Sequence, residues 1–218
     1  MSAERLGPFL LRQPPGVFPL GEDALRLAAF ATVRRSWKVC DLGTGSGCLL
    51  LLLSGRATGL DLYGVELDPT AARAARDNLM ENGLGGTVWT GDWNTLPGGT
   101  GPFDLVVSNP PYFAQGSGAS GGPARMEGRD GLESLCRTAA RLTRNGGRFA
   151  LCHRPERLAE VLDVLRAHRL EPKRLAFVKN RADAAPWLFL VEAQKNRKTG
   201  LRVEPDVLIS AGAALYGR

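Results

Sequence analysis

The chain has 218 residues, of which 44% are hydrophobic and 23% charged, and its formal net charge is +6. This length and apolar content suit one domain with a full core, and the longest apolar run, residues 48–53, is too short to cross a membrane. Residues 1–5 lack the basic start and apolar core of a signal peptide, and the four cysteines show no Cys-x-x-Cys spacing. We therefore expect a cytoplasmic protein with reduced cysteines and no bound metal.

The first core strand is expected at residues 38–42. It runs into a glycine-rich turn, Gly43-Thr44-Gly45-Ser46-Gly47, and then into a helix over residues 48–53. Glycines let the backbone approach a ligand closely, and the start of a helix offers unpaired N–H groups. A dinucleotide-binding fingerprint would need glycine in place of Cys48, and a P-loop would need Gly-Lys-Ser/Thr. The sequence fits better an acid at the strand end, Asp41, followed by Gly-x-Gly-x-Gly.

The next two expected strands, residues 62–65 and 87–90, also lead into acids, Glu66 and Asp92. An acid at the end of the second strand can accept hydrogen bonds from two ribose hydroxyls. Asp92 is placed to accept from an adenine amino group while Trp93 covers the ring. Acids at three consecutive strand ends beside one glycine turn predict a pocket for a nucleoside joined to an amino acid. The pattern does not include a phosphate-binding site.

Residues 103–108 form an apolar run of strand length, and Asn109-Pro110-Pro111-Tyr112 follows directly. In open α/β sheets ligands bind at this carboxyl edge of the strands. The prolines fix the backbone and leave the Pro110 carbonyl free to accept, Asn109 adds a second acceptor, and Tyr112 offers a flat face. Two acceptors and a ring suit a planar group that carries an exocyclic NH2.

The remaining elements complete an α/β pattern. Residues 115–123 are rich in Gly and Ser, and we interpret them as a lid that orders on substrate binding. His153 ends a strand, and we favour a structural role for it. Strands that alternate with helices predict a doubly wound, mainly parallel sheet. Helices are expected over residues 69–82, 131–143 and 155–168, a strand over 148–152, and a closing antiparallel pair at 174–179 and 187–193.

Charge is unevenly distributed along the chain. Residues 1–123 carry 9 basic and 11 acidic side chains, whereas residues 124–202 carry 18 basic and 9 acidic ones. Such asymmetry within one domain favours a polyanionic partner on one side. We therefore expect nucleic acid as the partner.

These motifs resemble, in their order along the chain, those of the class I S-adenosylmethionine-dependent methyltransferases. The resemblance implies a Rossmann-like fold, a seven-stranded sheet with an antiparallel last strand, and S-adenosyl-L-methionine as cofactor. It implies that residues 37–218 form the methyltransferase domain and that residues 1–36 are a segment packed on it. It places the cofactor against Asp41, Gly43, Thr44, Gly45, Gly47, Glu66, Leu67, Asp92, Trp93 and Asn109, and the methyl acceptor against Asn109, Pro110, Pro111 and Tyr112.

The segments before and after these motifs resemble one subfamily in particular. Gln13 and Phe18 before the fold, and the tail of residues 191–195, are similar to those of bacterial valine-tRNA adenine-N6 methyltransferases. This implies methylation of the adenine N6 amino group in tRNA, beside the anticodon. We expect the RNA to contact Phe113, Arg125, Lys195, Arg197 and Lys198. The basic residues expected to flank the pocket in sequence order are Arg125, Arg129, Lys195, Arg197 and Lys198.

Other classes stay open. Guanine-N2 methyltransferases of ribosomal RNA share the fold, but they tend to have phenylalanine where this chain has Tyr112. Release-factor glutamine methyltransferases share the Asn-Pro-Pro-Tyr motif, but they carry a helical N-terminal domain for which residues 1–36 leave no room. A binding module without catalysis would be expected to lack part of the acid series or of the acceptor motif, and both are intact here.

Overall fold

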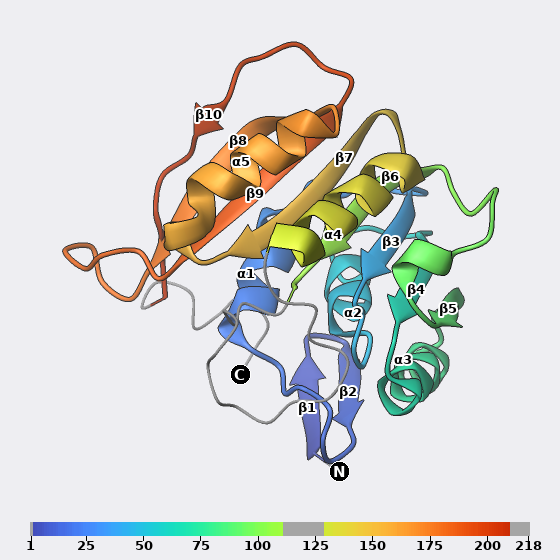
Figure 1. Cartoon of the computed structure of the whole chain (residues 1–218). Coiled ribbons are helices and arrows are strands. Elements are labelled where there is room, and N and C mark those ends of the chain that lie inside the picture. Colours follow the sequence, from blue (N-terminus) through green and yellow to red (C-terminus); the bar gives the residue numbers. More distant parts are fainter. Residues whose placement is uncertain (1, 111–128, 210–218) are drawn as a thin grey trace.

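The computed structural model describes residues 2–110 and 129–209. Its main sheet has the strand order β10-β8-β9-β7-β6-β3-β4-β5 (Figure 1), and β11, paired to β8, brings the number of strands to nine. The seven long strands are β3 (Lys38–Leu42), β4 (Asp61–Glu66), β5 (Gly86–Thr90), β6 (Phe103–Ser108), β7 (Thr143–His153), β8 (Leu170–Lys179) and β9 (Leu188–Lys195). β10 (Arg202–Val203) and β11 (Val207–Leu208) are short additions that the sequence pattern did not predict.

Strand direction confirms the predicted fold class. β3, β4, β5, β6 and β7 pair in parallel, whereas β9 runs antiparallel to both β7 and β8. The carboxyl ends of the parallel strands therefore meet at one edge, which we call the carboxyl edge. β9 is the strand that ends at the opposite edge, which we call the amino edge.

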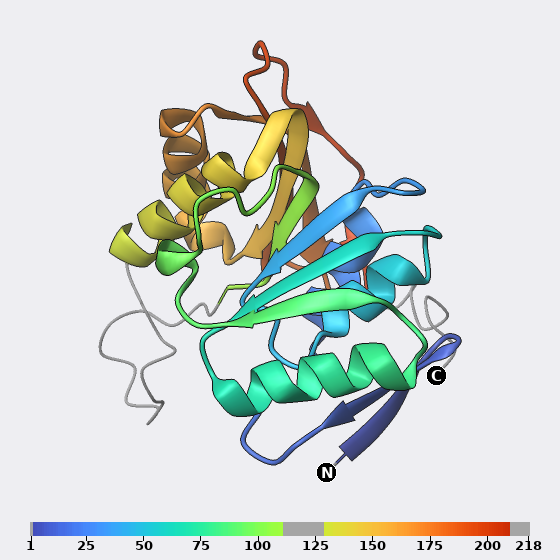
Figure 2. The same ribbon diagram turned by 90° about the vertical axis from the view of Figure 1, so that its right-hand side faces the viewer.

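Helices cover both faces of the sheet, as alternation of strands and helices requires (Figures 1 and 2). One apolar core lies beneath α1 (Glu22–Phe30), α2 (Cys48–Ser54) and α3 (Pro69–Glu81). The other lies beneath α4 (Arg129–Leu142) and α5 (Leu158–Ala167). Neighbouring residues of one strand serve opposite cores: Val39 packs in the first and Cys40 in the second, because successive side chains alternate across a strand.

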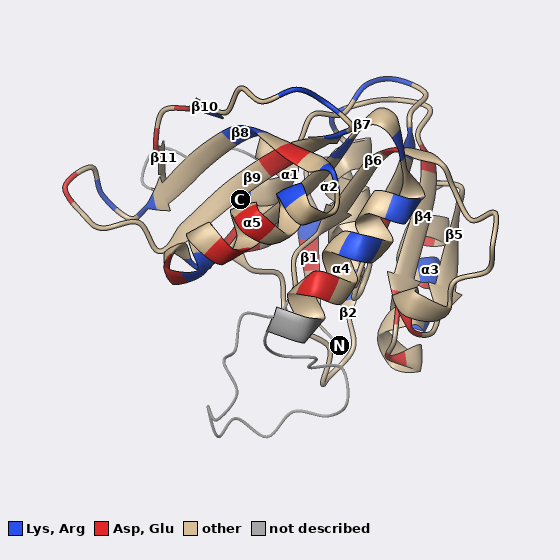
Figure 3. Cartoon of the chain, turned by 45° about the horizontal axis from the view of Figure 1, so that its top comes forward, with Lys and Arg blue, Asp and Glu red and all other residues tan. Residues whose placement is uncertain are grey.

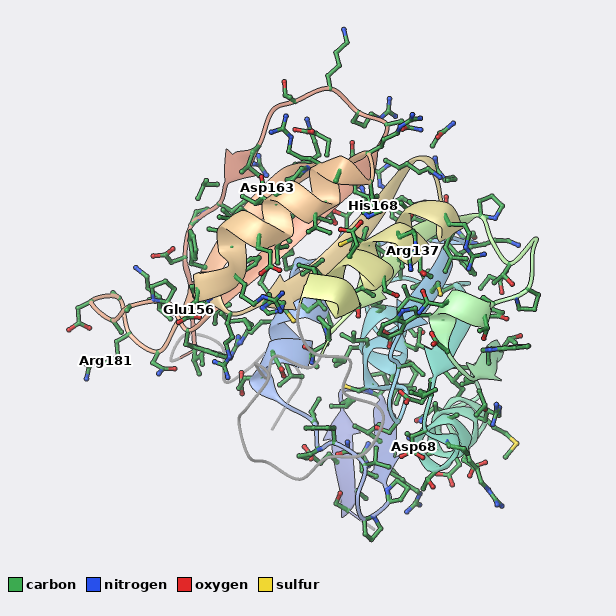
Figure 4. All side chains as sticks on the ribbon, viewed as in Figure 1. Asp68, Arg137, Glu156, Asp163, His168 and Arg181 are labelled. Atoms are coloured by element: carbon green, nitrogen blue, oxygen red, sulfur yellow. The ribbon has the colours of Figure 1, made fainter. Side chains whose placement is uncertain are left out.

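Helix boundaries follow local chemistry. Asp68 caps α3 by accepting from the Thr70 amide at 2.8 Å, Pro69 takes the first helical position, and Gly83 follows the helix at φ 67° (Figure 4). The helix expected over residues 155–168 is a 3₁₀ turn, η2 (Pro155–Arg157), followed by α5. His168 at the end of α5 reaches Glu133 of α4 at 2.5 Å, which ties these two helices together.

The N-terminal residues form a hairpin and a helix. β1 (Ser2–Leu6) and β2 (Phe9–Gln13) pair antiparallel below α3 in Figure 2. The amide of Arg12 donates to Asn78 Oδ1 at 2.9 Å, and that of Leu10 donates to Asn82 Oδ1 at 2.8 Å, so the hairpin is fixed to α3. No helix in the described ranges is long and apolar enough to span a membrane.

Candidate active site

The glycine turn of residues 43–47 lies at the carboxyl edge between β3 and α2. Gly43, Gly45 and Gly47 adopt φ values of 78°, 55° and 85°, a left-handed region that side chains make costly. The amides of Gly43 and Thr44 both donate to the Val65 carbonyl, at 2.9 and 3.0 Å, which fixes the turn to the end of β4. A Cβ on Gly47 would lie 3.3 Å from the backbone of Ala75, so α3 also packs closely against the turn.

Glu66 supports this turn directly. Its Oε2 accepts from the Gly45 amide at 2.7 Å, and its Oε1 accepts from the Asp68 amide at 2.9 Å. The carboxylate therefore points towards the glycine turn, as a ribose ligand in this position requires. Both oxygens already hold protein donors, and each keeps a further lone pair for a ligand hydroxyl. The sequence did not suggest this supporting contact.

The environment of Asp41 indicates a ligand more clearly than that of any other residue in this site. It is only 1% exposed, and neither carboxylate oxygen has a hydrogen-bond partner among the described residues. Burial raises the pKa of Asp41 to about 7; the nearby Thr44 hydroxyl opposes the rise, and the Glu66 carboxylate adds to it. A buried carboxylate without partners is costly. A cationic, hydrogen-donating group such as the amino-acid end of S-adenosylmethionine would satisfy it, so these residues fit that cofactor.

The residues after the end of β5 lie near the glycine turn, where the sequence predicts the adenine of the cofactor. Asp92 caps η1 (Trp93–Thr95), and its Oδ1 accepts from the backbone amide and the side chain of Asn94, at 2.8 and 2.9 Å. A Cβ on Gly43 would lie 3.8 Å from the Trp93 ring, which places the indole beside the glycine turn. Trp93 Nε1 donates to Ser134 of α4 at 3.1 Å. Leu67, directly after Glu66, is 42% exposed and offers an apolar surface.

The predicted acceptor motif begins where β6 ends. The Ser108 hydroxyl donates to the Leu42 carbonyl at 2.7 Å, so the ends of β6 and β3 are held together and Asn109 follows beside the glycine turn. Asn109 Oδ1 accepts from the buried thiol of Cys152 at 3.1 Å. Pro110 is the last described residue of this stretch. Pro111, Tyr112, Phe113, Arg125 and the Gly/Ser-rich segment lie outside the described residues.

Two residues of β7 adjoin this position. Sequence reasoning missed the contact of Cys152 with Asn109, although the order of the strands places the end of β7 beside the end of β6. His153 is buried, accepts from the Arg154 amide through Nδ1 at 2.8 Å, and stacks on Phe189. Burial lowers the pKa of His153 to about 4, and the positive charge of Arg157 contributes to the same shift. His153 is therefore uncharged near neutral pH.

The expectation that Lys195, Arg197 and Lys198 flank the pocket is wrong. His153, at the carboxyl edge, pairs with Phe189, and β9 then runs away from it to Lys195. Six residues at ~3.4 Å each put Lys195 ~20 Å from that edge. Lys195 Nζ instead donates to the carbonyl of Thr143, at the amino end of β7, at 2.8 Å. In Figure 1 the chain after β9 lies at the top, opposite the carboxyl edge.

The described residues also hold a cavity away from this site, but no metal-binding cluster and no disulfide bond. A cavity of about 380 Å³ lies between Gly7 of the hairpin turn and Gly55 beyond α2, and none of the residues discussed above line it. Within residues 2–110 and 129–209, no three His, Cys, Asp or Glu side chains are grouped to hold a metal ion. None of the four cysteines, which all lie in the described ranges, forms a disulfide bond.

The strand order, the antiparallel β9 and the glycine turn define a class I S-adenosylmethionine-dependent methyltransferase. Residues 11–162 match the model of the methyltransferase small domain, and the chain belongs to this family. S-adenosylmethionine is accordingly its methyl donor.

Comparison with known proteins identifies related enzymes. A tRNA1(Val) (adenine(37)-N6)-methyltransferase from Parabacteroides distasonis is 30% identical over 79% of this chain and 75% of that protein. One of the same name from Edwardsiella ictaluri is 34% identical over 75% of this chain and 69% of that protein. The Thermus thermophilus 16S rRNA N2 G1207 methyltransferase, solved with S-adenosylmethionine and guanosine, shares the fold with a TM-score of 0.66. That similarity has 23% identity and covers 89% of this chain and 50% of that one.

Proposed function

We propose that this enzyme transfers a methyl group from S-adenosylmethionine to the N6 amino group of an adenine in tRNA, beside the anticodon. The observation that carries the proposal is the 30% identity over 75% of a relative named for methylation of adenine 37 in tRNA1(Val). The position of Asn109, held by Cys152 at the carboxyl edge beside the glycine turn, supports it, because an amide oxygen there can accept from an exocyclic amino group.

The chain's residues divide into two groups in this proposal. Asp41 and the glycine turn hold the amino-acid end of the cofactor, Glu66 holds the ribose, and Asp92 with Leu67 and Trp93 holds the adenine. When bound, the cofactor supplies an electrophilic methyl group on a sulfonium. The protein's task is then to align the acceptor nitrogen with that methyl group and to exclude other geometries.

Asn109 and the Pro110 carbonyl act on the acceptor. The adenine amino nitrogen is a poor nucleophile, since its lone pair is delocalised into the ring. Hydrogen bonds from its two hydrogens to Asn109 Oδ1 and the Pro110 carbonyl localise that pair as positive charge develops. The methyl group that a bound S-adenosylmethionine would supply would pass to this nitrogen and leave S-adenosylhomocysteine. Neither Asn109 nor the Pro110 carbonyl is a strong base, so the surplus proton would go to solvent afterwards. The base must leave its stack to reach this position, and we assign the replacement stacking to Tyr112 or Phe113.

Labelled methyl transfer to three substrate classes tests the proposal. The protein is incubated with radiolabelled S-adenosylmethionine and, separately, with total tRNA, with 16S rRNA and with a release factor. We expect label in tRNA alone, released on digestion as N6-methyladenosine. Label in rRNA as N2-methylguanosine, or in the release factor as methylglutamine, would refute the proposal and assign the enzyme to another branch of the fold.

A further inference from the structure

The amino edge of the sheet carries a cluster of cations that the active site does not use. We define the amino-edge basic surface as Arg169, Lys173, Lys195, Arg197 and Lys198. These residues come from the turn between α5 and β8, from β8 itself, and from the end of β9 and the chain after it. In Figure 3 the blue segments between β9 and β10 mark part of this surface.

Hydrogen bonds and close approaches locate the members of the surface at the amino edge. Lys173 Nζ donates to the Lys198 carbonyl at 3.1 Å, and the Asn196 amide donates to the Arg169 carbonyl at 2.9 Å. A Cβ on Gly146 would lie 2.5 Å from the Arg197 guanidinium, so Arg197 lies across the turn at the start of β7. Lys195 donates to Thr143 in the same strand. All five cations therefore lie at the amino edge, around the start of β7 and the end of β9.

These charges are not neutralised by the protein. Across the described ranges, none of the five side chains has a carboxylate within 4.0 Å. The neighbouring acids are engaged with other arginines: Glu171 with Arg166, and Glu204 with Arg174 and Arg202. Arg197 and Lys198 are exposed. Five like charges gathered without counterions favour a polyanion as the partner.

We infer that the amino-edge basic surface binds the phosphate backbone of the substrate RNA, at a distance from the methylated nucleotide; this rests on the proposed function. The surface begins ~20 Å from the carboxyl edge along β9. At ~3.4 Å per phosphate along one stacked strand, that separation corresponds to roughly six nucleotides. The surface therefore contacts nucleotides remote from the target adenine and selects for an extended, structured RNA. Asn145 and Asn196 add amide groups among the cations.

The test compares two charge-matched double variants. Arg197→Glu with Lys198→Glu reverses two exposed cations of the surface. Arg5→Glu with Arg73→Glu reverses two exposed cations on β1 and α3 instead. Binding of fluorescent tRNA1(Val) transcript is measured by anisotropy over a series of salt concentrations, together with KM and kcat for methylation and with S-adenosylmethionine affinity as a check on folding.

For the surface variant we expect roughly tenfold weaker binding of tRNA at low salt. The slope of the logarithm of the binding constant against the logarithm of the salt concentration should become shallower by about 1.4, at ~0.7 for each lost phosphate contact. KM for tRNA should rise, while kcat at saturating tRNA and cofactor affinity stay unchanged. The control variant should resemble wild type. Equal weakening in both variants would reveal a net-charge effect and overturn the inference.

Other outcomes separate this inference from the proposed function. Wild-type protein that binds tRNA without methylating it, with binding weakened only in the surface variant, would support the surface and refute the proposed function. Normal methylation of tRNA, with unchanged tRNA binding in the surface variant, would support the proposed function and overturn the inference about the surface. Unchanged tRNA binding with lost binding to phosphatidylserine vesicles would assign the surface to membranes and overturn the inference.

Discussion

Replacement of Asp41 by asparagine should stabilise the cofactor-free protein while impairing cofactor binding. The Asp41 carboxylate is 1% exposed, has no hydrogen-bond partner among the described residues, and has a pKa raised by burial from 3.8 to about 7. The folded protein therefore keeps a proton that the unfolded chain releases above pH ~4. Because the unfolded state binds fewer protons in this window, the contribution of Asp41 to stability falls as pH rises.

The magnitude follows from the two pKa values. Between the pKa of Asp41 in the unfolded chain and its pKa in the folded protein, each pH unit lowers the unfolding free energy by ~1.4 kcal/mol. The loss of stability therefore reaches about 4 kcal/mol at pH 7 and then levels off. The side-chain amide of the Asp41→Asn variant would not titrate. The difference in unfolding free energy between this variant and wild type should thus be close to zero near pH 4 and grow in favour of the variant up to pH 7.

Urea unfolding at half-unit steps from pH 4.5 to 8 measures this difference, and titrations common to both proteins cancel in it. Calorimetry at pH 8 should show S-adenosylmethionine binding weakened by roughly 10- to 100-fold in the variant, because a hydrogen bond to a charged group contributes ~1.5–3 kcal/mol. A difference in stability that is flat from pH 5 to 8 would refute the argument from burial. Unchanged cofactor affinity would remove Asp41 from the cofactor site.

Three further substitutions probe the turn and the acceptor side. Gly47→Ala should lower stability by about 1–2 kcal/mol, since its φ of 85° is left-handed and its Cβ would crowd Ala75; an unchanged Tm would contradict this. Asn109→Ala should remove most turnover and leave cofactor affinity nearly intact, and turnover at the wild-type rate would exclude an acceptor role. Cys152→Ala should lower kcat by a few-fold through loss of the bond to Asn109 Oδ1, whereas Cys152→Ser should restore it, because a hydroxyl donates more strongly than a thiol. Equal kcat in all three proteins would show that the thiol does not position Asn109.

Much of the fold was predictable because the sequence encodes it locally. β6 contains three consecutive apolar residues, 105–107, as expected of a buried parallel strand, and Asp68 with Pro69 marks the start of α3. The β1–β2 hairpin was not predicted, since Ser2–Leu6 is short, polar and largely exposed. Asn78 and Asn82, which fix the hairpin to α3, are 66 to 72 residues away in the chain.

The sequence could place only those site residues that lie at the ends of strands, because the topology of the sheet fixes their positions. Asp41, Glu66 and Asp92 each lie at or just beyond the end of a parallel strand, so their shared edge follows from topology. The error over Lys195, Arg197 and Lys198 arose because proximity in the chain was given more weight than strand direction. An antiparallel β9 necessarily carries its end to the opposite edge. The contact of Glu66 with Gly45 was beyond prediction, since it depends on the left-handed path of the turn.

The central claim is that an adenine amino group of tRNA is methylated at the position of Asn109. Its most direct test is mass spectrometry of nuclease fragments from a tRNA1(Val) transcript after incubation with the protein and S-adenosylmethionine, beside a transcript in which adenine 37 is replaced by purine, which lacks the amino group. The proposal predicts one added methyl group on the fragment that contains adenine 37, digestible to N6-methyladenosine, and none on the purine transcript. A methyl group on another nucleotide, or equal methylation of both transcripts, would contradict it.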